Sequence, residues 1–214
     1  MKEKAGFLGM AKLGLVLAIF AAAACVMLAF VYNGTQAVIA QRQQSDLQAA
    51  LKDLFPDADN FEKIDSLQSP DVTVTIENAY AALKNGNAVG AALRLSRASY
   101  GGAIKTMTGV SADGRITGVK IMEHSDTPGL GANAASPKYY VDRANLITFY
   151  GQFAGKNVID PFRAKDDVAA ITASTVTSQA VASSVKAAGI AVTAWLAGEE
   201  VDAVSGASEG WENE

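Results

Sequence analysis

A run of twenty residues without a charge, from Leu13 to Tyr32, restricts this chain more than any other feature. As an α-helix it spans about 30 Å, the thickness of the hydrocarbon core of a bilayer. Lys2, Lys4 and Lys12 precede the run, and positive residues favour the cytoplasmic side of a membrane. We therefore predict a single-pass anchor in the inner membrane, with its N-terminus in the cytoplasm and the main domain outside it.

Three other kinds of N-terminal segment fit the residues less well. A cleaved signal peptide needs a shorter apolar region that ends in small residues, whereas Ala21–Ala24 lie in the middle of this one. A lipoprotein would use Cys25, but Ala22 stands three residues before it where Leu is usual. A pilin needs a glutamate five residues after the glycine of the Gly6-Phe7 step, where Ala11 stands. A permanent anchor remains the preferred interpretation.

Composition excludes several classes of function for the part of the chain beyond the anchor. Residues 1–32 carry a net charge of +2 and the remainder carries −6, which argues against a nucleic-acid partner. One cysteine and one histidine, His124, allow no disulfide within the chain and no His/Cys metal site. We expect no catalytic residue and no metal ligand, so that any chemistry depends on a cofactor.

Periodicity beyond the anchor predicts an α+β domain in which helices pack on an antiparallel sheet. Ser45 is a plausible start for a stalk helix, and Pro56 closes it. Asp113-Gly114 is a strong hairpin signal between two strands. The remaining expected elements are strands at 71–77, 89–99, 103–110 and 116–123, a short helix at 78–84 and an amphipathic helix at 175–196 that Gly198 ends.

Three further segments have the composition of a binding site. Tyr100-Gly101-Gly102 lies between two strands, and paired glycines allow a close approach of the backbone to a ligand. The segment 126–131 contains Thr-Pro-Gly, which fits a type II turn. The segment 171–178 places five hydroxyl groups at the start of the last helix. It is either a Ser/Thr-rich helix cap or a phosphate site.

Taken in order, these segments resemble the bacterial FMN-binding domain of the G subunit of the Rnf complex. That domain is related to the C subunit of the sodium-pumping NADH:quinone reductase. The resemblance runs from about Ser99 to Val192 and includes the hairpin at Asp113-Gly114 and a Phe-x-Gly-Lys segment at 153–156. Such proteins carry Glu-Thr-Pro-Gly-Leu-Gly, and here Asp126 stands in place of the Glu.

The resemblance implies that FMN is attached through a phosphodiester bond to the last threonine of the hydroxyl-rich motif, which is Thr177 here. In the family the motif reads Asp-x-x-Ser/Thr-Gly-Ala-Ser/Thr-x-Thr. Thr172, Thr175 and Thr177 keep their places, but Ala173 and Ser174 replace the Gly and the Ala. Ala169 stands where the Asp is expected.

The resemblance also implies the other cofactor contacts. Ser174, Thr175 and the helix amides would hold the phosphate, and Thr172 belongs to the same motif. Gly129 and Leu130 would lie near the isoalloxazine, and Thr127 and Tyr100 would lie near its edge. The implied domains are a cytoplasmic tip at 1–12, the anchor at 13–32, a stalk helix and linker at 33–69, the FMN-binding domain at 70–198 and an acidic tail at 199–214.

The implied function is that of an electron-transfer subunit without independent catalysis. Its complex couples electron flow between ferredoxin and NAD to translocation of Na⁺ or H⁺. The expected partners are the other membrane and peripheral Rnf subunits and a flavin transferase during maturation. Two alternatives stay open: a single-anchor FMN module of another extracytoplasmic electron-transfer chain, and a flavin-free scaffold subunit.

Overall fold

The computed structural model of this chain describes residues 2–65 and 67–198. The chain divides into two compact units, residues 1–48 and residues 49–214, which are described separately. The predicted acidic tail at 199–214 lies outside the described residues.

The first unit consists of helix α1 (Lys2–Leu54), whose last turn belongs to the second unit. The part from Lys12 is long and apolar enough to cross a membrane, and none of its most apolar stretch is buried. Helix α2 (Thr175–Ala197) is also long and apolar enough, but 56% of its most apolar stretch is buried, as in the core helix of a folded domain. Residues Leu13–Tyr32 are therefore the better candidate for the span.

Helix α1 is continuous through Ser45, so the prediction of a separate helix starting there is wrong. No glycine or proline occurs between residues 35 and 54, and nothing in that segment forces a break. The helix ends at Leu54, two residues before Pro56, as predicted. The residue before a proline is disfavoured in the helical conformation, which explains this end.

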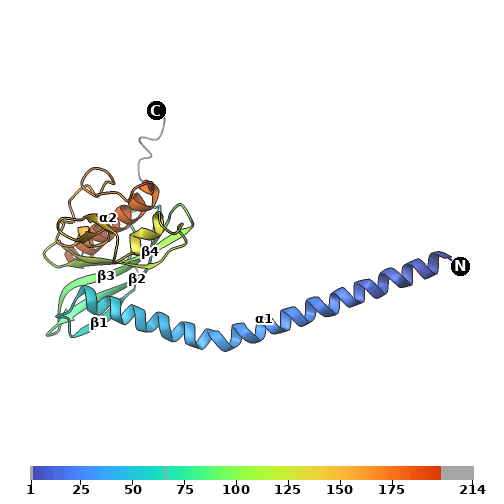
Figure 1. Cartoon of the computed structure of the whole chain (residues 1–214). Coiled ribbons are helices and arrows are strands. Elements are labelled where there is room, and N and C mark those ends of the chain that lie inside the picture. The colour runs from blue at the N-terminus through green and yellow to red at the C-terminus, as the bar shows by residue number, and fades with distance from the viewer. Residues whose placement is uncertain (1, 66, 199–214) are drawn as a thin grey trace. The chain divides into compact units, whose positions relative to one another are not determined.

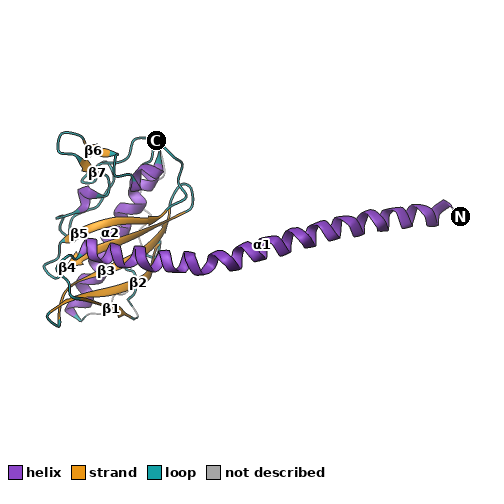
Figure 2. Cartoon of the chain, turned by 60° about the horizontal axis from the view of Figure 1, so that its bottom comes forward, coloured by secondary structure: helices purple, strands orange, loops and turns teal. Residues whose placement is uncertain are grey.

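The second unit contains a five-stranded antiparallel sheet (Figure 1), and its strands follow one another in chain order (Figure 2). This confirms the α+β class. The strands are β1 (Asn60–Ile64), β2 (Val74–Lys84), β3 (Asn87–Ala98), β4 (Ala103–Ser111) and β5 (Ile116–Glu123). After them come the short helices η1 (Gly131–Ala135) and η2 (Gly151–Phe153), with the small hairpin β6 (Tyr140–Asp142) and β7 (Ile147–Thr148) between them, and then α2.

The sheet differs from the sequence prediction at its first two strands. Residues 78–84, predicted as a short helix, continue β2, so that prediction is wrong. Pairing with both β1 and β3 outweighs the helix propensity of this alanine-rich segment. Asn85 and Gly86 then adopt positive φ angles of 52° and 79°, which suit a tight hairpin turn. Strand β1 lies within the segment 33–69 that we assigned to a stalk and linker.

Helix α2 covers one face of the sheet and closes the hydrophobic core there (Figures 1 and 2). Leu93 and Leu95 of β3 are fully buried in the same cluster as Val181 and Val185 of α2. The helix ends at Gly198, as predicted, in a left-handed conformation with φ of 73°. The packing of Val181 and Val185 on the sheet holds α2 in place.

The last turn of α1 packs on the opposite face of the sheet, where glycines replace side chains (Figure 2). A Cβ atom at Gly118 would lie 3.0 Å from Leu54 Cδ2, and one at Gly109 would lie 3.1 Å from Leu54 Cβ. Gly109 and Gly118 are paired across β4 and β5. The two glycines therefore form the floor on which Leu54, only 6% exposed, is buried.

We predict that Leu54→Ala lowers the free energy of unfolding by about 2–5 kcal/mol, because it leaves a cavity above these glycines. Val72→Ala is the matched control, since Val72 is 64% exposed and its truncation should change stability by less than about 0.5 kcal/mol. Chemical denaturation of the full chain in mild detergent, followed by intrinsic fluorescence, measures both. Equal stability of the two variants would contradict this packing.

A candidate flavin site at the start of α2

The three segments singled out in the sequence meet at one cavity of about 410 Å³. It lies where the β3–β4 loop, the loop after β5 and the start of α2 come together. Its lining residues are Tyr100, Asp126, Thr127, Leu130, Gly131, Ala173, Ser174, Thr175, Val176 and Thr177. Segments that are far apart in the sequence therefore line one cavity.

The loop after β5 is shaped by the predicted turn at Thr127-Pro128-Gly129. Gly129 has a φ of 79°, as the third position of a type II turn requires. The amide of Leu130 donates to the carbonyl of Thr127 at 3.1 Å and closes the turn. The turn leaves Leu130 41% exposed at the cavity.

The β3–β4 loop approaches the loop after β5 closely, and Gly101 makes this approach possible. A Cβ atom at Gly101 would lie 2.8 Å from Asp126 Cα, so a larger residue would displace the backbone. The Gly101 amide donates to Asp126 Oδ1 at 2.6 Å. The sequence predicted a close approach to a ligand, whereas the close approach in the structure is to the protein's own backbone.

The start of α2 has no side-chain cap. Ser174 occupies the N-cap position and makes no side-chain hydrogen bond to the helix. The Ser178 hydroxyl instead donates to the Ser174 carbonyl at 2.9 Å and accepts from the Ile171 amide at 2.9 Å. First-turn amides have no acceptor within a helix, and the helix dipole adds positive potential at that end. This end of the helix can therefore bind an anion at the cavity.

Ala173, next to the N-cap, has a φ of 58°, in the left-handed region that favours glycine. It is the position at which the FMN-binding motif has glycine. An alanine held there costs about 1 kcal/mol relative to glycine. Alanine is thus less suited than glycine to the backbone conformation at this position.

Thr177, in the first turn of α2, is 1% exposed and lies against Asp126 and Ser99. Ser99 Oγ is 2.7 Å from Asp126 Oδ2 and 3.2 Å from Thr177 Oγ1. Gly131 makes room for this cluster, because a Cβ atom there would lie 2.6 Å from Thr177 Oγ1.

Burial alone would raise the pKa of Asp126, but the hydroxyl groups of Ser99 and Thr177, the Gly101 amide and the neighbouring His124 lower it below its ordinary value. The carboxyl group is therefore ionised at neutral pH. Its contribution to stability is present at neutral pH and is lost as the pH falls through this lowered pKa.

Six of the eight residues assigned to cofactor binding from the sequence line the cavity: Tyr100, Thr127, Leu130, Ser174, Thr175 and Thr177. The other two lie outside its lining. Gly129 sets the turn and accepts a hydrogen bond from Asn133 at 2.9 Å, and Thr172 is exposed, with its amide donating to the Tyr139 hydroxyl at 3.3 Å.

Sequence reasoning did not assign five residues of this site to cofactor binding: Asp126, Gly131, Ala173 and Val176, which line the cavity, and Ser99, which contacts Thr177. Asp126 and Gly131 stand inside the quoted motif, and the family's acidic residue at position 126 was the available signal. Val176, 57% exposed, lines the cavity together with its neighbours Thr175 and Thr177 in the first turn of α2. Only the structure reveals Ser99.

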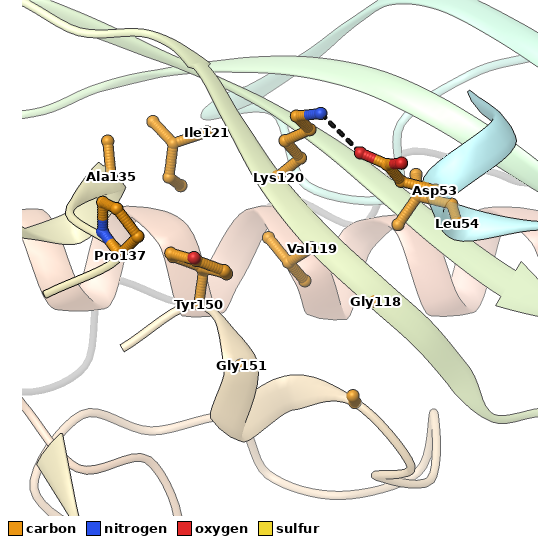
Figure 3. Close-up of a pocket in the computed structure, with 11 residues that line it drawn as sticks. Asp53, Leu54, Gly118, Val119, Lys120, Ile121, Ala135, Pro137, Tyr150 and Gly151 are labelled. Atoms are coloured by element: carbon orange, nitrogen blue, oxygen red, sulfur yellow. Dashed lines mark hydrogen bonds and ion pairs between the residues drawn. The ribbon is translucent and has the colours of Figure 1, made fainter. Parts of the chain in front are cut away.

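A second cavity of about 470 Å³ lies beside β5 and is separate from these motifs (Figure 3). Lys120 and Asp53, 2.7 Å apart, pair at one end, and Pro137 and Tyr150 lie at the other. Its lining contains none of the hydroxyl groups of the helix start. The smaller cavity at α2 is therefore the better candidate site.

Comparison with known proteins agrees with this geometry. An FMN-binding domain family matches residues 99–189, which include all three segments of the cavity. The RnfG N-terminal region family matches residues 1–54, which correspond to α1. The G subunit of the ion-translocating oxidoreductase complex of Methanosarcina acetivorans is 32% identical over 174 residues, which is 79% of this chain and 87% of that protein.

This chain belongs to the family of Rnf complex G subunits. Another relative is the G subunit of the proton-translocating ferredoxin:NAD(+) oxidoreductase complex of Clostridium ljungdahlii, 31% identical over 81% of this chain and 86% of that protein. The corresponding subunit of the Na(+)-translocating complex of Acetobacterium woodii is 29% identical over 81% of this chain and 87% of that protein.

Membership of the Rnf G family supports attachment to a membrane through α1. Among solved structures, NqrC of Shewanella oneidensis is 16% identical, with a TM-score of 0.37 over 66% of this chain and 67% of that one.

We predict that Ala173→Gly raises the free energy of unfolding by about 1 kcal/mol, because glycine adopts the left-handed conformation without strain. Ala194→Gly, within α2, is the opposite control and should lower it by about 0.5–1 kcal/mol. Denaturation of the full chain in detergent measures both changes. A loss of stability on Ala173→Gly would show that the backbone at this position is not under strain.

Proposed function

We propose that this chain is an electron-transfer subunit that carries FMN as a phosphodiester on Thr177. The observation that supports this most strongly is the convergence of three distant motif segments on one cavity at an uncapped helix start. Thr177 lies in that first turn with its hydroxyl oriented by Ser99 and Asp126.

The residues of the cavity fit FMN in size and in chemistry. A volume of about 410 Å³ falls within the range of about 300–1,000 Å³ that is usual for small-molecule sites. Tyr100, Leu130 and Val176 line it and are 79%, 41% and 57% exposed, so they can offer apolar surface to a flat ring. The hydroxyl groups and first-turn amides at the start of α2 suit a phosphate.

FMN supplies the electron transfer, and the protein supplies position and surroundings. Ser174, Thr175 and the first-turn amides would hold the phosphate, next to the attachment oxygen of Thr177. Leu130 and Val176 would exclude water from the ring, and Thr127 and Tyr100 would lie near its edge. Gly129 acts through the turn it forms, and Thr172 belongs to the segment that leads into the helix.

Within its family, this protein would serve a membrane complex that couples electron flow between ferredoxin and NAD to translocation of Na⁺ or H⁺. The names of the relatives in Clostridium ljungdahlii and Acetobacterium woodii support that reaction. Its partners would be the other Rnf subunits, with a flavin transferase needed once, during maturation.

The proposed topology places the FMN-binding domain outside the cytoplasm, because Lys2, Lys4 and Lys12 precede the anchor. A covalent bond then has a physical purpose, since a cofactor that dissociates there cannot be replaced from the cytoplasmic pool.

We predict that a reporter that is active only in the cytoplasm gives no signal when fused after Glu214. The same reporter fused after Lys12, before the apolar run, is the control and should be active. Strong activity of the Glu214 fusion, or a purified chain that begins near Cys25, would contradict the topology.

We predict that Thr177→Ala abolishes covalent flavin, because it removes the oxygen that forms the ester. Thr177→Ser keeps an oxygen and should retain part of the flavin, and Thr175→Ala should weaken phosphate contacts but leave the linkage possible. In-gel flavin fluorescence after denaturation, with peptide mass spectrometry, measures the adduct in chains produced together with a flavin transferase.

Ser178→Ala is the matched control, because Ser178 is the adjacent buried hydroxyl but bonds to the backbone of Ile171 and Ser174. It should keep its flavin. An undiminished fluorescent band from Thr177→Ala would move the attachment to another hydroxyl, and Thr175 would be tested next. A wild-type chain without a band would refute covalent attachment.

A further inference from the structure

The hydroxyl group of Thr177 does not project freely into the cavity but ends a short chain of polar atoms. From Thr177 Oγ1 to Ser99 Oγ the distance is 3.2 Å, and from Ser99 Oγ to Asp126 Oδ2 it is 2.7 Å. A serine hydroxyl both donates and accepts. Ser99 can therefore donate to the carboxylate while its oxygen accepts the proton of Thr177.

The position of Asp126 in this chain of atoms is tightly fixed. Asp126 is 6% exposed, and its other oxygen accepts the Gly101 amide at 2.6 Å. Gly131 leaves space only for the cluster itself, since a Cβ atom there would lie 2.7 Å from Asp126 Cβ. One carboxylate oxygen is thus fixed by the backbone, and the other accepts a hydrogen bond from Ser99, whose hydroxyl group contacts Thr177.

From this geometry we infer that Ser99 and Asp126 form a proton relay that activates Thr177 when the flavin is attached. The inference rests on the proposed function, in which Thr177 receives FMN. In this scheme the chain is the acceptor of the flavin, and its own residues remove the proton from Thr177.

The donor must be a phosphoanhydride of FMN, such as FAD, because forming a phosphodiester from an alcohol requires a leaving group on phosphorus. Thr177 Oγ1 forms the new bond to the FMN phosphorus, and the anhydride bond to the second phosphate breaks. With FAD, AMP leaves. The Thr177 proton passes to Ser99 Oγ while the Ser99 proton passes to Asp126. No electrons are transferred.

A relay of this kind explains why an acidic residue is buried beside a residue that would carry an anionic phosphodiester. As the bond forms, Asp126 takes up the proton and is neutral at that moment, so it does not repel the phosphate that arrives. Asp126 is ionised before the reaction, so its carboxylate is free to accept that proton.

The test is single-turnover flavin attachment to the purified full-length chain, with FAD, Mg²⁺ and a purified flavin transferase, followed by in-gel fluorescence. General-base catalysis contributes roughly 10²–10⁴-fold, so we expect Asp126→Asn and Ser99→Ala each to slow attachment by about 100-fold or more. Asp126→Glu, which restores the acidic residue of the family motif, should stay within about tenfold of wild type.

Asp167→Asn is the control for a purely structural carboxylate. Asp167 also accepts two backbone amides, from Phe162 at 3.1 Å and Arg163 at 2.6 Å, and is paired with Lys156, but it lies outside the cavity lining. This variant should attach flavin at the wild-type rate. Thermal unfolding of every variant identifies any loss of fold.

The pH profile separates a relay from a structural role. Dividing the Asp126→Asn rate by the wild-type rate at each pH removes the pH dependence of the transferase. The ratio should rise with pH, because hydroxide from solvent replaces the missing base. A constant ratio, or attachment to either Asp126→Asn or Ser99→Ala at the wild-type rate, would overturn the relay. Failure of the wild-type chain to accept flavin would refute the proposed function instead.

Discussion

The buried carboxylate of Asp126 is the interaction on which the candidate site depends. Through Gly101 and Ser99 it fixes the β3–β4 loop, and through Ser99 and the space left by Gly131 it positions Thr177. Without these bonds, a charge that is 6% exposed would be costly to bury. The same bonds that make its burial possible therefore also bring the three segments together.

The sequence predicted the structure correctly where residues close together in the chain determine it. Thr-Pro-Gly at 127–129 produced the predicted turn, and the stripe of apolar residues along 175–196 produced α2. The prediction failed where long-range pairing decides: residues 78–84 have the composition of a helix but lie between two strands, and β1 carries too short a pattern to stand out. Sheet pairing overrides propensity in such segments.

The site itself could be predicted only in part, for a similar reason. The motif residues share a cavity because the fold brings the β3–β4 loop and the loop after β5 to the start of α2. Ser99 precedes the first motif by one residue and has no signature of its own, so its contact with Asp126, 27 residues away, is a property of the fold. The strain at Ala173 was likewise visible only in the backbone angle of 58°.

Three locally unfavourable features occur within the same site: an uncapped helix start, an alanine in the left-handed region and a buried acidic group. Positive φ angles also occur outside this site, at Leu146, Phe162 and Lys165, whereas at Gly198 glycine takes the left-handed position that ends α2. Several locally unfavourable conformations or buried charges close together are typical of functional sites, where binding a ligand offsets their energetic cost. Free helix amides gain an anionic partner when a phosphate occupies the cavity. The folded domain is thus expected to be most stable only after its cofactor has been attached.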